Sequence, residues 1–190
     1  MEAIMKVLLL CDRESATGSN LRDAVLSLLT EMGHNVTAIT LDHRDLHPCI
    51  GCFSCWTRTP GECVVTSDNA NSIAKALVCA DAVVLLSRIT YGGYSADIKS
   101  FLDRSIQNIA ADFEVYKGEM RHMMRYSRFP LWIAVGYGDA SAAEQRTFAC
   151  MVQRNALNVR PKDYLVLTIQ DRGELEEAAQ PILRLLGAGA

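Results

Sequence analysis

The feature that most constrains this chain is an alternation of two hydrophobic patterns along its length. Short apolar runs are typical of buried strands, and between them apolar residues recur at the spacing of an amphipathic helix. The runs that predict strands cover residues 4–11, 36–41, 82–86, 130–135 and 164–169. The segments that predict helices cover residues 19–32, 68–79, 96–109, 142–157 and 174–186.

Strands that are apolar on both sides and joined by helices form a parallel sheet with both faces covered. The sequence therefore predicts an α/β fold, a doubly wound five-stranded parallel sheet with helices on both faces. No internal repeat or linker divides the 190 residues, so we expect one domain over residues 1–190. Residues 110–129 show neither pattern, and within this long irregular stretch we expect a functional insertion at 110–128.

Charge and hydropathy exclude two classes of partner. A net charge of −3 argues against general nucleic-acid binding. No apolar run approaches the ~20 residues that cross a bilayer, and residues 4–11 fit a strand better than a signal peptide. We therefore expect a cytoplasmic protein with reduced cysteines and neither a nucleic-acid nor a membrane partner.

The loop after the first predicted strand, residues 12–20, is rich in hydroxyls and leads into a helix. In open α/β sheets ligands bind beyond the carboxyl ends of the strands, and a helix N-terminus attracts phosphate. Simple capping of the helix by Thr17 or Ser19 remains an alternative. The candidate phosphate-binding residues are Arg13, Ser15, Thr17, Ser19 and Asn20.

The loops after the third and fourth predicted strands combine glycines with tyrosines. Glycine lets backbone amides approach a heterocycle, and a tyrosine ring can border its face, although plain turns would have the same composition. Together with a phosphate-binding loop, this pattern suits a flat mononucleotide lying across the end of the sheet. The candidates are Ser87, Thr90, Tyr91, Gly92, Gly93, Tyr94, Gly136, Tyr137 and Gly138.

Four of the seven cysteines lie in one loop, "PCIGCFSCWTRTPGEC" at residues 48–63, within a cysteine-rich segment 48–64. Four thiolates with this spacing can surround a cubane cluster or a tetrahedral zinc. Free cysteine also behaves as a small hydrophobe, so metal-free thiols remain open, as does a disulfide. The candidate metal ligands are Cys49, Cys52, Cys55 and Cys63, whereas Cys11, Cys79 and Cys150 are expected in the core.

The insertion at 110–128 mixes basic residues with methionines and aromatic residues. Its apolar content predicts packing against a second subunit, and therefore a homodimer or homotetramer. Alternatively, arginines such as Arg121 and Arg125 hold the phosphates of a nicotinamide nucleotide.

The cysteine loop and "SRITYGGYSADIKSFLDR" at residues 87–104, in this order, resemble the flavodoxin-like NAD(P)H-dependent FMN reductases and the related iron-sulfur flavoproteins. The resemblance covers nearly the whole chain and implies strand order 2-1-3-4-5. It also implies FMN, with its phosphate in loop 12–20 and its isoalloxazine against residues 87–95 and 136–138. One departure is that Asp12 would repel the phosphate unless Arg13 offsets it.

From this resemblance we expect an FMN-dependent oxidoreductase that passes electrons from NAD(P)H to a small acceptor such as a quinone, a flavin or a metal ion. The flavin would carry the chemistry. No protein acid or base is expected, because no histidine falls in the three strand-end loops. The alternative is an electron carrier or redox sensor, with a [4Fe-4S] cluster held by Cys49, Cys52, Cys55 and Cys63, as the resemblance to iron-sulfur flavoproteins implies.

Overall fold

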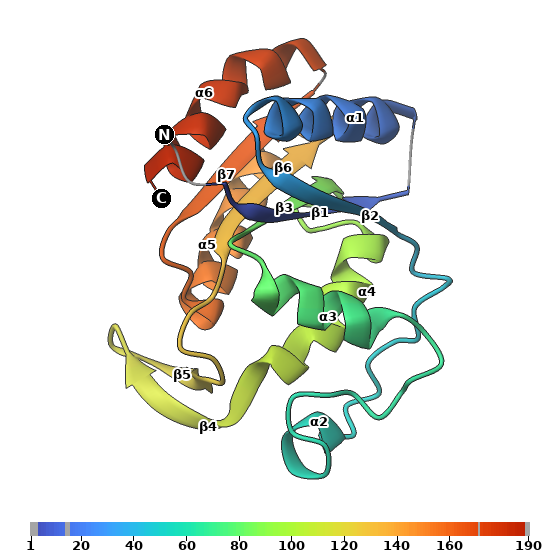
Figure 1. Cartoon of the computed structure of the whole chain (residues 1–190), viewed down its shortest axis with the longest axis vertical. Helices are drawn as coiled ribbons and strands as arrows, with labels where there is room; N and C mark the ends of the chain where they lie inside the picture. The colour runs from blue at the N-terminus through green and yellow to red at the C-terminus, as the bar shows by residue number, and fades with distance from the viewer. Residues whose placement is uncertain (1–3, 14–15, 171, 189–190) are drawn as a thin grey trace.

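Five parallel strands form the central sheet in a computed structural model that describes residues 4–13, 16–170 and 172–188 (Figure 1). Their order across the sheet is β2-β1-β3-β6-β7. Counting the strands of this sheet alone, the order is 2-1-3-4-5, and the predicted fold class is confirmed. The strands are β1 (Lys6–Asp12), β2 (Asn35–Leu41), β3 (Ala82–Arg88), β6 (Leu131–Tyr137) and β7 (Tyr164–Ile169).

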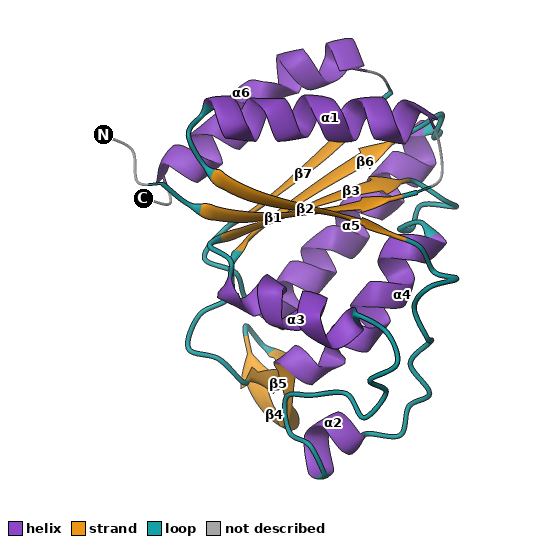
Figure 2. Cartoon of the chain, turned by 45° about the vertical axis from the view of Figure 1, so that its right-hand side comes forward, coloured by secondary structure: helices purple, strands orange, loops and turns teal. Residues whose placement is uncertain are grey.

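Helices cover both faces of the sheet (Figure 2). α1 (Ala16–Glu31) and α6 (Arg172–Ala188) lie on one face, and α3 (Ala70–Cys79), α4 (Ala96–Arg104) and α5 (Ala142–Val159) lie on the other. The helix expected over residues 96–109 ends at Arg104, where a 3₁₀ turn, Ser105–Asn108, takes over. A short helix, α2 (Ser54–Thr57), lies within the cysteine-rich segment.

The strands are apolar on both sides because the sheet divides the hydrophobic core in two. In β1, Leu8 and Leu10 belong to the cluster under α3, α4 and α5, whereas Leu9 and Cys11 belong to the cluster under α1 and α6. Successive side chains of a strand point to opposite faces, so a strand buried on both sides must be a continuous apolar run. This packing explains why the strands were visible in the sequence.

The insertion at 110–128 is not irregular, which corrects the expectation. It forms an antiparallel hairpin of β4 (Ile109–Tyr116) and β5 (Glu119–Met124). Lys117 and Gly118 make the connection with φ of 50° and 78°, the left-handed conformation that a two-residue type I′ turn requires. In Figures 1 and 2 the hairpin and α2 project from the same end of the molecule, away from the sheet.

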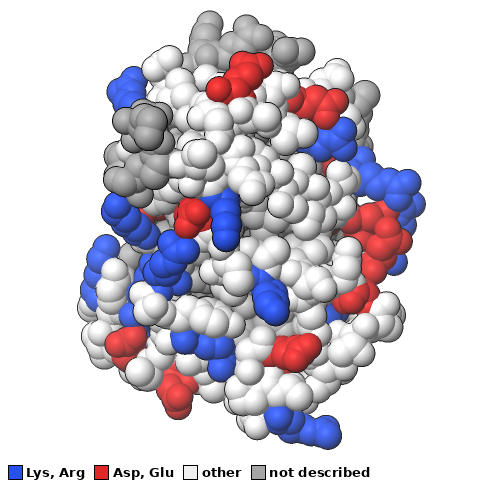
Figure 3. Space-filling model, in the orientation of Figure 1, with Lys and Arg blue, Asp and Glu red and all other residues white. Residues whose placement is uncertain are grey.

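The surface carries no extended region of one charge on the face shown in Figure 3, where basic and acidic side chains are interspersed. Among the described residues, no helix combines the length and the apolar character that crossing a bilayer requires.

Candidate functional site

The carboxyl ends of β1, β3 and β6 meet at a buried carboxylate, Asp12. It accepts hydrogen bonds from the Arg88 backbone N–H at 2.6 Å and the Tyr137 hydroxyl at 2.5 Å. Burial raises the pKa of Asp12, and these hydrogen bonds act in the opposite direction. Asp12 therefore faces inward, and Tyr137, which is 1% exposed, uses its hydroxyl to join the strand ends. The expectation that the Tyr137 ring borders a flavin is corrected accordingly.

The glycine pair after β3 forms a tight turn with a projecting aromatic side chain. Thr90 and Gly93 exchange backbone hydrogen bonds of 3.0 and 2.8 Å, and Tyr91 and Gly92 between them have φ of 50° and 76°. A Cβ on Gly92 would lie 2.7 Å from Thr147 Cβ, so the turn packs closely against α5. Tyr91 is 93% exposed, which leaves its ring available to a ligand.

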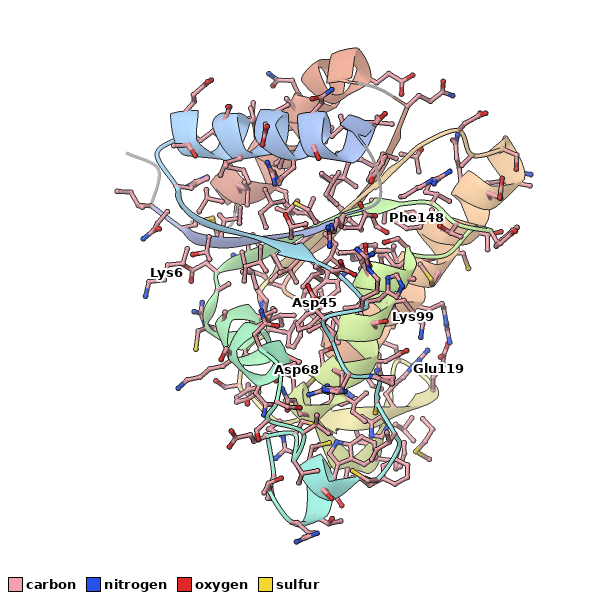
Figure 4. All side chains as sticks on the ribbon, turned by 90° about the vertical axis from the view of Figure 1, so that its right-hand side faces the viewer. Lys6, Asp45, Asp68, Lys99, Glu119 and Phe148 are labelled. Carbon is pink, nitrogen blue, oxygen red and sulfur yellow. The ribbon has the colours of Figure 1, made fainter. Side chains whose placement is uncertain are left out.

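Other residues predicted for this edge shape the loops from inside. The Ser87 hydroxyl accepts a hydrogen bond of 2.9 Å from the Ser95 N–H, and both residues are buried. The buried Tyr94 ring packs edge-on against Phe148 and lines a cavity together with Leu102 of α4 and Met151 of α5. Gly136 packs against Phe148 and Ile89. Gly138, with φ of 105°, stands beside the Arg88 side chain. Figure 4 labels Phe148 and, at the opposite end of the sheet, Lys6 of β1.

The predicted phosphate-binding loop is shorter than expected, because α1 begins at Ala16. Thr17, Ser19 and Asn20 are exposed in its first two turns, where backbone N–H groups and the helix dipole favour an anion. Only glycine fits at position 18, because a Cβ there would lie 2.3 Å from the Tyr137 hydroxyl. Ser15 lies outside the described residues.

Arg13 does not pair with Asp12, and its side chain is directed to the end of β2. Its backbone N–H donates to Asp97 Oδ2 at 3.0 Å, and its guanidinium forms an ion pair with Asp42, just after β2. Asp42 also accepts from Arg44, with Nε–Oδ1 and Nη2–Oδ2 distances of 2.9 and 2.6 Å. The hydrogen bonds from Arg44 and Arg13 hold the pKa of Asp42 far below its usual range.

A histidine does stand at this edge of the sheet, in the loop after β2. The His43 backbone N–H donates to Asp97 Oδ1 at 2.7 Å, and His43 Nδ1 lies 2.6 Å from the same oxygen. Asp97 is 2% exposed and thus ties the ends of β1 and β2 to the first turn of α4. Ligand atoms of Asp42, His43 and Asp97 lie within 4.8 Å of one another, but the arginines on Asp42 oppose a cation there.

The sequence predicted neither the interior hydrogen bonds of Asp12 nor any role for Asp42, His43 and Asp97. The available signal was that three of them are polar residues directly after apolar strands, at positions 12, 42 and 43. In a parallel sheet such positions meet at one edge.

The four clustered cysteines line one small pocket between the loop and the 3₁₀ turn. Cys49 and Cys52 are exposed, Cys63 is half-buried and Cys55 is buried, and all four are free thiols. Burial, followed by the charges of the other three thiols, raises the pKa of Cys55. Hydrogen bonds from Ser54 lower the pKa of Cys52. Of the remaining cysteines, Cys11 is buried as predicted, but Cys79 and Cys150 are exposed, which corrects the expectation.

The ends of the cysteine loop are joined by a buried ion pair. Arg104 Nη1 donates to Asp68 Oδ2 at 2.9 Å, and the two side chains are 1% and 2% exposed. Arg104 also donates to the carbonyl oxygens of His47 and Val65, at 2.7 and 3.1 Å, on either side of the loop. Asp68, labelled in Figure 4, lies below the sheet near the start of α3. We call this arrangement the loop neck.

An aromatic series connects the cysteine loop to the hairpin. Phe53 stacks on Trp56 at a centroid separation of 5.2 Å, Trp56 lies 5.0 Å from His122, and His122 lies 4.2 Å from Phe113. Phe113 is 58% exposed, and Val115 and Met120 beside it are 69% and 65% exposed. The outer hairpin face is therefore an exposed apolar surface next to the cysteine pocket.

Comparison with known sequences gives partial matches to iron-sulfur flavoproteins. The chain is 36% identical over 80 residues to one from Methanocaldococcus jannaschii, a match that covers 42% of this chain and 40% of the relative. It is 30% identical over 108 residues to one from Archaeoglobus fulgidus, covering 57% of this chain and 53% of the relative. The chain thus spans about half or less of the length of these relatives.

Solved structures share the fold over nearly the whole chain. An NAD(P)H:quinone oxidoreductase from Methanothermobacter marburgensis superposes with a TM-score of 0.64 at 15% identity, covering 98% of this chain and 95% of that one. An azoreductase from Bacillus anthracis gives 0.62 at 17% identity, with the same coverage. The family model of the NADPH-dependent FMN reductases matches residues 5–160, most of the chain. This protein therefore belongs to the NADPH-dependent FMN reductase family.

Proposed function

We propose that the chain is an FMN-dependent oxidoreductase that passes electrons from NAD(P)H to a small acceptor such as a quinone, a flavin or a metal ion. The observation that carries the proposal is the carboxyl edge of the sheet. There the exposed Tyr91, on a glycine turn, and the first turn of α1 flank the strand ends joined by Asp12.

The residues present fit an FMN. The first-turn N–H groups of α1 would hold its phosphate, with the exposed side chains of Thr17, Ser19 and Asn20 beside it. Asp12 Oδ1 lies under that turn, 3.5 Å from where a Cβ of Gly18 would stand, and the hydrogen bonds from the Tyr137 hydroxyl and the Arg88 N–H are what offset its charge there. Tyr91 and the backbone of Gly92 and Gly93 would border the isoalloxazine, opposite the loop at Gly138. Bound FMN supplies hydride acceptance and electron transfer, and the chain's own residues hold it and limit access.

The test is reconstitution followed by turnover. The FMN-loaded protein should oxidise NADPH rapidly under anaerobic conditions when menadione is added, and slowly without an acceptor. Stoichiometric FMN binding without NADPH or NADH oxidation for any of a quinone, free flavin or ferric acceptor would contradict the enzyme and favour an electron carrier.

A second candidate is an electron carrier or redox sensor with a [4Fe-4S] cluster, and the four-cysteine pocket favours it. Tetrahedral zinc at Zn–S of ~2.3 Å needs sulfurs ~3.8 Å apart. Among the described residues no three cysteine sulfurs come within 4.8 Å of one another. Four cysteine thiolates are the usual ligand set of a [4Fe-4S] cluster. Cys49, Cys52, Cys55 and Cys63 would hold it.

We also propose that the outer hairpin face packs against a second copy of the chain in a homodimer or homotetramer. Its exposed Phe113, Val115 and Met120 support this assembly. The inner face is already occupied by two ion pairs, Glu119 with Arg154 of α5 and Glu114 with Arg160, which directly follows that helix.

A further inference from the structure

Two arginines converge on one carboxylate at the end of β2. Arg13 and Arg44 both pair with Asp42 through the contacts given above. The Asp42 side chain is 7% exposed, whereas those of Arg13 and Arg44 are 59% and 64% exposed. The carboxylate is therefore held inside, and both guanidinium groups are presented to solvent.

The three side chains carry one net positive charge. Asp42 stays ionised because its pKa is far below the usual range, so one carboxylate balances one of the two guanidiniums. The nearby acids are Asp97, which pairs with His43, and Asp45, whose charge acts on Arg44. Asp97 is buried, and its oxygens accept hydrogen bonds from the backbone N–H groups of Arg13 and His43 and contact the His43 ring. Asp45 is therefore the exposed acid that competes with an anion for the two arginines.

A guanidinium that a carboxylate already holds in place can bind a second anion with a smaller loss of side-chain entropy. Holding the side chain in place before binding removes part of the entropy cost of ordering it, and a guanidinium bonds phosphate with two parallel N–H donors. Two such groups on one carboxylate therefore form a receptor that suits a dianionic terminal phosphate.

The arginines of the hairpin are less exposed than Arg13 and Arg44 or lie at the other edge of the sheet, and the Arg121 side chain is only 16% exposed. Arg121 pairs with Glu119, and Arg125 donates to the carbonyl oxygens of Gln107 and Ile109 at 3.0 and 3.2 Å. Arg128 pairs with Asp81, which precedes β3 and so lies at the amino edge of the sheet. The alternative of a nucleotide phosphate held by the hairpin is thus disfavoured.

The position of Arg13 and Arg44 suits the far half of a dinucleotide. The end of β2 is two strands from the end of β3, in the order β2-β1-β3. At about 4.8 Å per strand this separation is roughly 10 Å, within the span of one dinucleotide whose nicotinamide lies near Tyr91.

We propose that Arg13 and Arg44, held by Asp42, bind the 2′-phosphate of NADPH and make the protein prefer NADPH to NADH. An arginine beside the ribose is the usual way in which α/β nucleotide sites accommodate this phosphate. The inference rests on the proposed function, because it assigns the electron donor of that same reaction.

The test compares Arg44→Gln with wild type, both loaded with FMN. Losing a charge-assisted contact should raise the KM for NADPH ~10- to 100-fold and leave kcat and the KM for NADH within about twofold. Arg44→Lys, which keeps the charge but loses the two parallel donors, should fall between the two. Arg22→Gln is the control, because Arg22 is a half-buried arginine of α1 that pairs with Asp23.

A direct titration separates this inference from the proposed function. Isothermal titration of the FMN-loaded wild type should show tighter binding of 2′,5′-ADP than of 5′-AMP, and Arg44→Gln should abolish the difference without changing the flavin spectrum. Equal binding of the two nucleotides by wild type, or equal loss of NADPH and NADH turnover in Arg44→Gln, would overturn the inference. Retained preference for 2′,5′-ADP without any turnover would instead refute the proposed oxidoreductase.

Discussion

Removing one partner of the loop neck should destabilise the whole domain. Asp68 and Arg104 are almost completely buried, so Asp68→Asn leaves the guanidinium of Arg104 without its counter-charge. Breaking a buried ion pair in this way costs about 3–5 kcal/mol. In a domain of this size 1 kcal/mol shifts Tm by about 2–4 °C, so Tm should fall by about 6–20 °C.

The double variant Asp68→Leu/Arg104→Met separates the charge from the packing. Replacing both partners removes the unpaired buried charge but leaves the carbonyl oxygens of His47 and Val65 without the Arg104 donors, so the double variant should recover only part of the loss. Urea unfolding of wild type, Asp68→Leu, Arg104→Met and the double variant gives the coupling free energy between positions 68 and 104.

The same pair sets a pH dependence. Burial favours the neutral form of Asp68, but hydrogen bonds from Arg104, His47 and Ala70 outweigh it and lower the pKa. The stabilisation is therefore complete above the unfolded pKa, near 4, and is lost as pH falls through the lower folded value. Asp68→Asn should lack this acid-dependent component. A loss of stability below 1 kcal/mol in the single variant, or an unchanged acid profile, would refute the reasoning.

Three further predictions concern the flavin edge, the hairpin and the cysteines. Gly92→Ala forces a side chain against Thr147 at positive φ, so flavin affinity by fluorescence titration should fall at least tenfold, and an unchanged affinity would contradict the placement. Val115→Lys/Met120→Lys puts charges on the outer hairpin face and should give monomers by light scattering, and an already monomeric wild type at micromolar concentration would exclude the interface. A maleimide should label the exposed Cys52, whose pKa is lowered, before Cys11, whose pKa burial raises to about 12. If a cluster is present in anaerobically prepared protein, Cys52→Ser should remove the iron but keep the FMN. Wild type that contains no iron would exclude the cluster.

The sheet was predictable because each of its strands is visible in the sequence as a short apolar run. Residues 82–86, for example, are apolar without interruption since Val83 and Val84 face different halves of the core. The hairpin was missed because its alternation is broken by an irregularity between Ile109 and Phe113 and its faces are only partly buried. The Lys117–Gly118 pair was the available turn signal.

The candidate site was predicted at the level of loops, not of side chains. Glycine and tyrosine composition selected the loop at 87–95, but it could not distinguish the exposed Tyr91 from the buried Tyr94. The interior contacts of Asp12 join residues 76 and 125 positions apart in sequence, so no local pattern encodes them. The same is true of Arg104, which reaches across 57 positions to His47.

The aromatic series beside the cysteine pocket gives the molecule a built-in optical reporter. Trp132 is 2% exposed in the core, so its emission should stay constant while the native fold persists. Trp56 follows Cys55 directly and touches both Phe53 and His122. Oxidation or metal loading of the thiols would therefore change the surroundings of one indole and not the other, and in a Trp132→Phe protein the state of the pocket could be followed by fluorescence in real time.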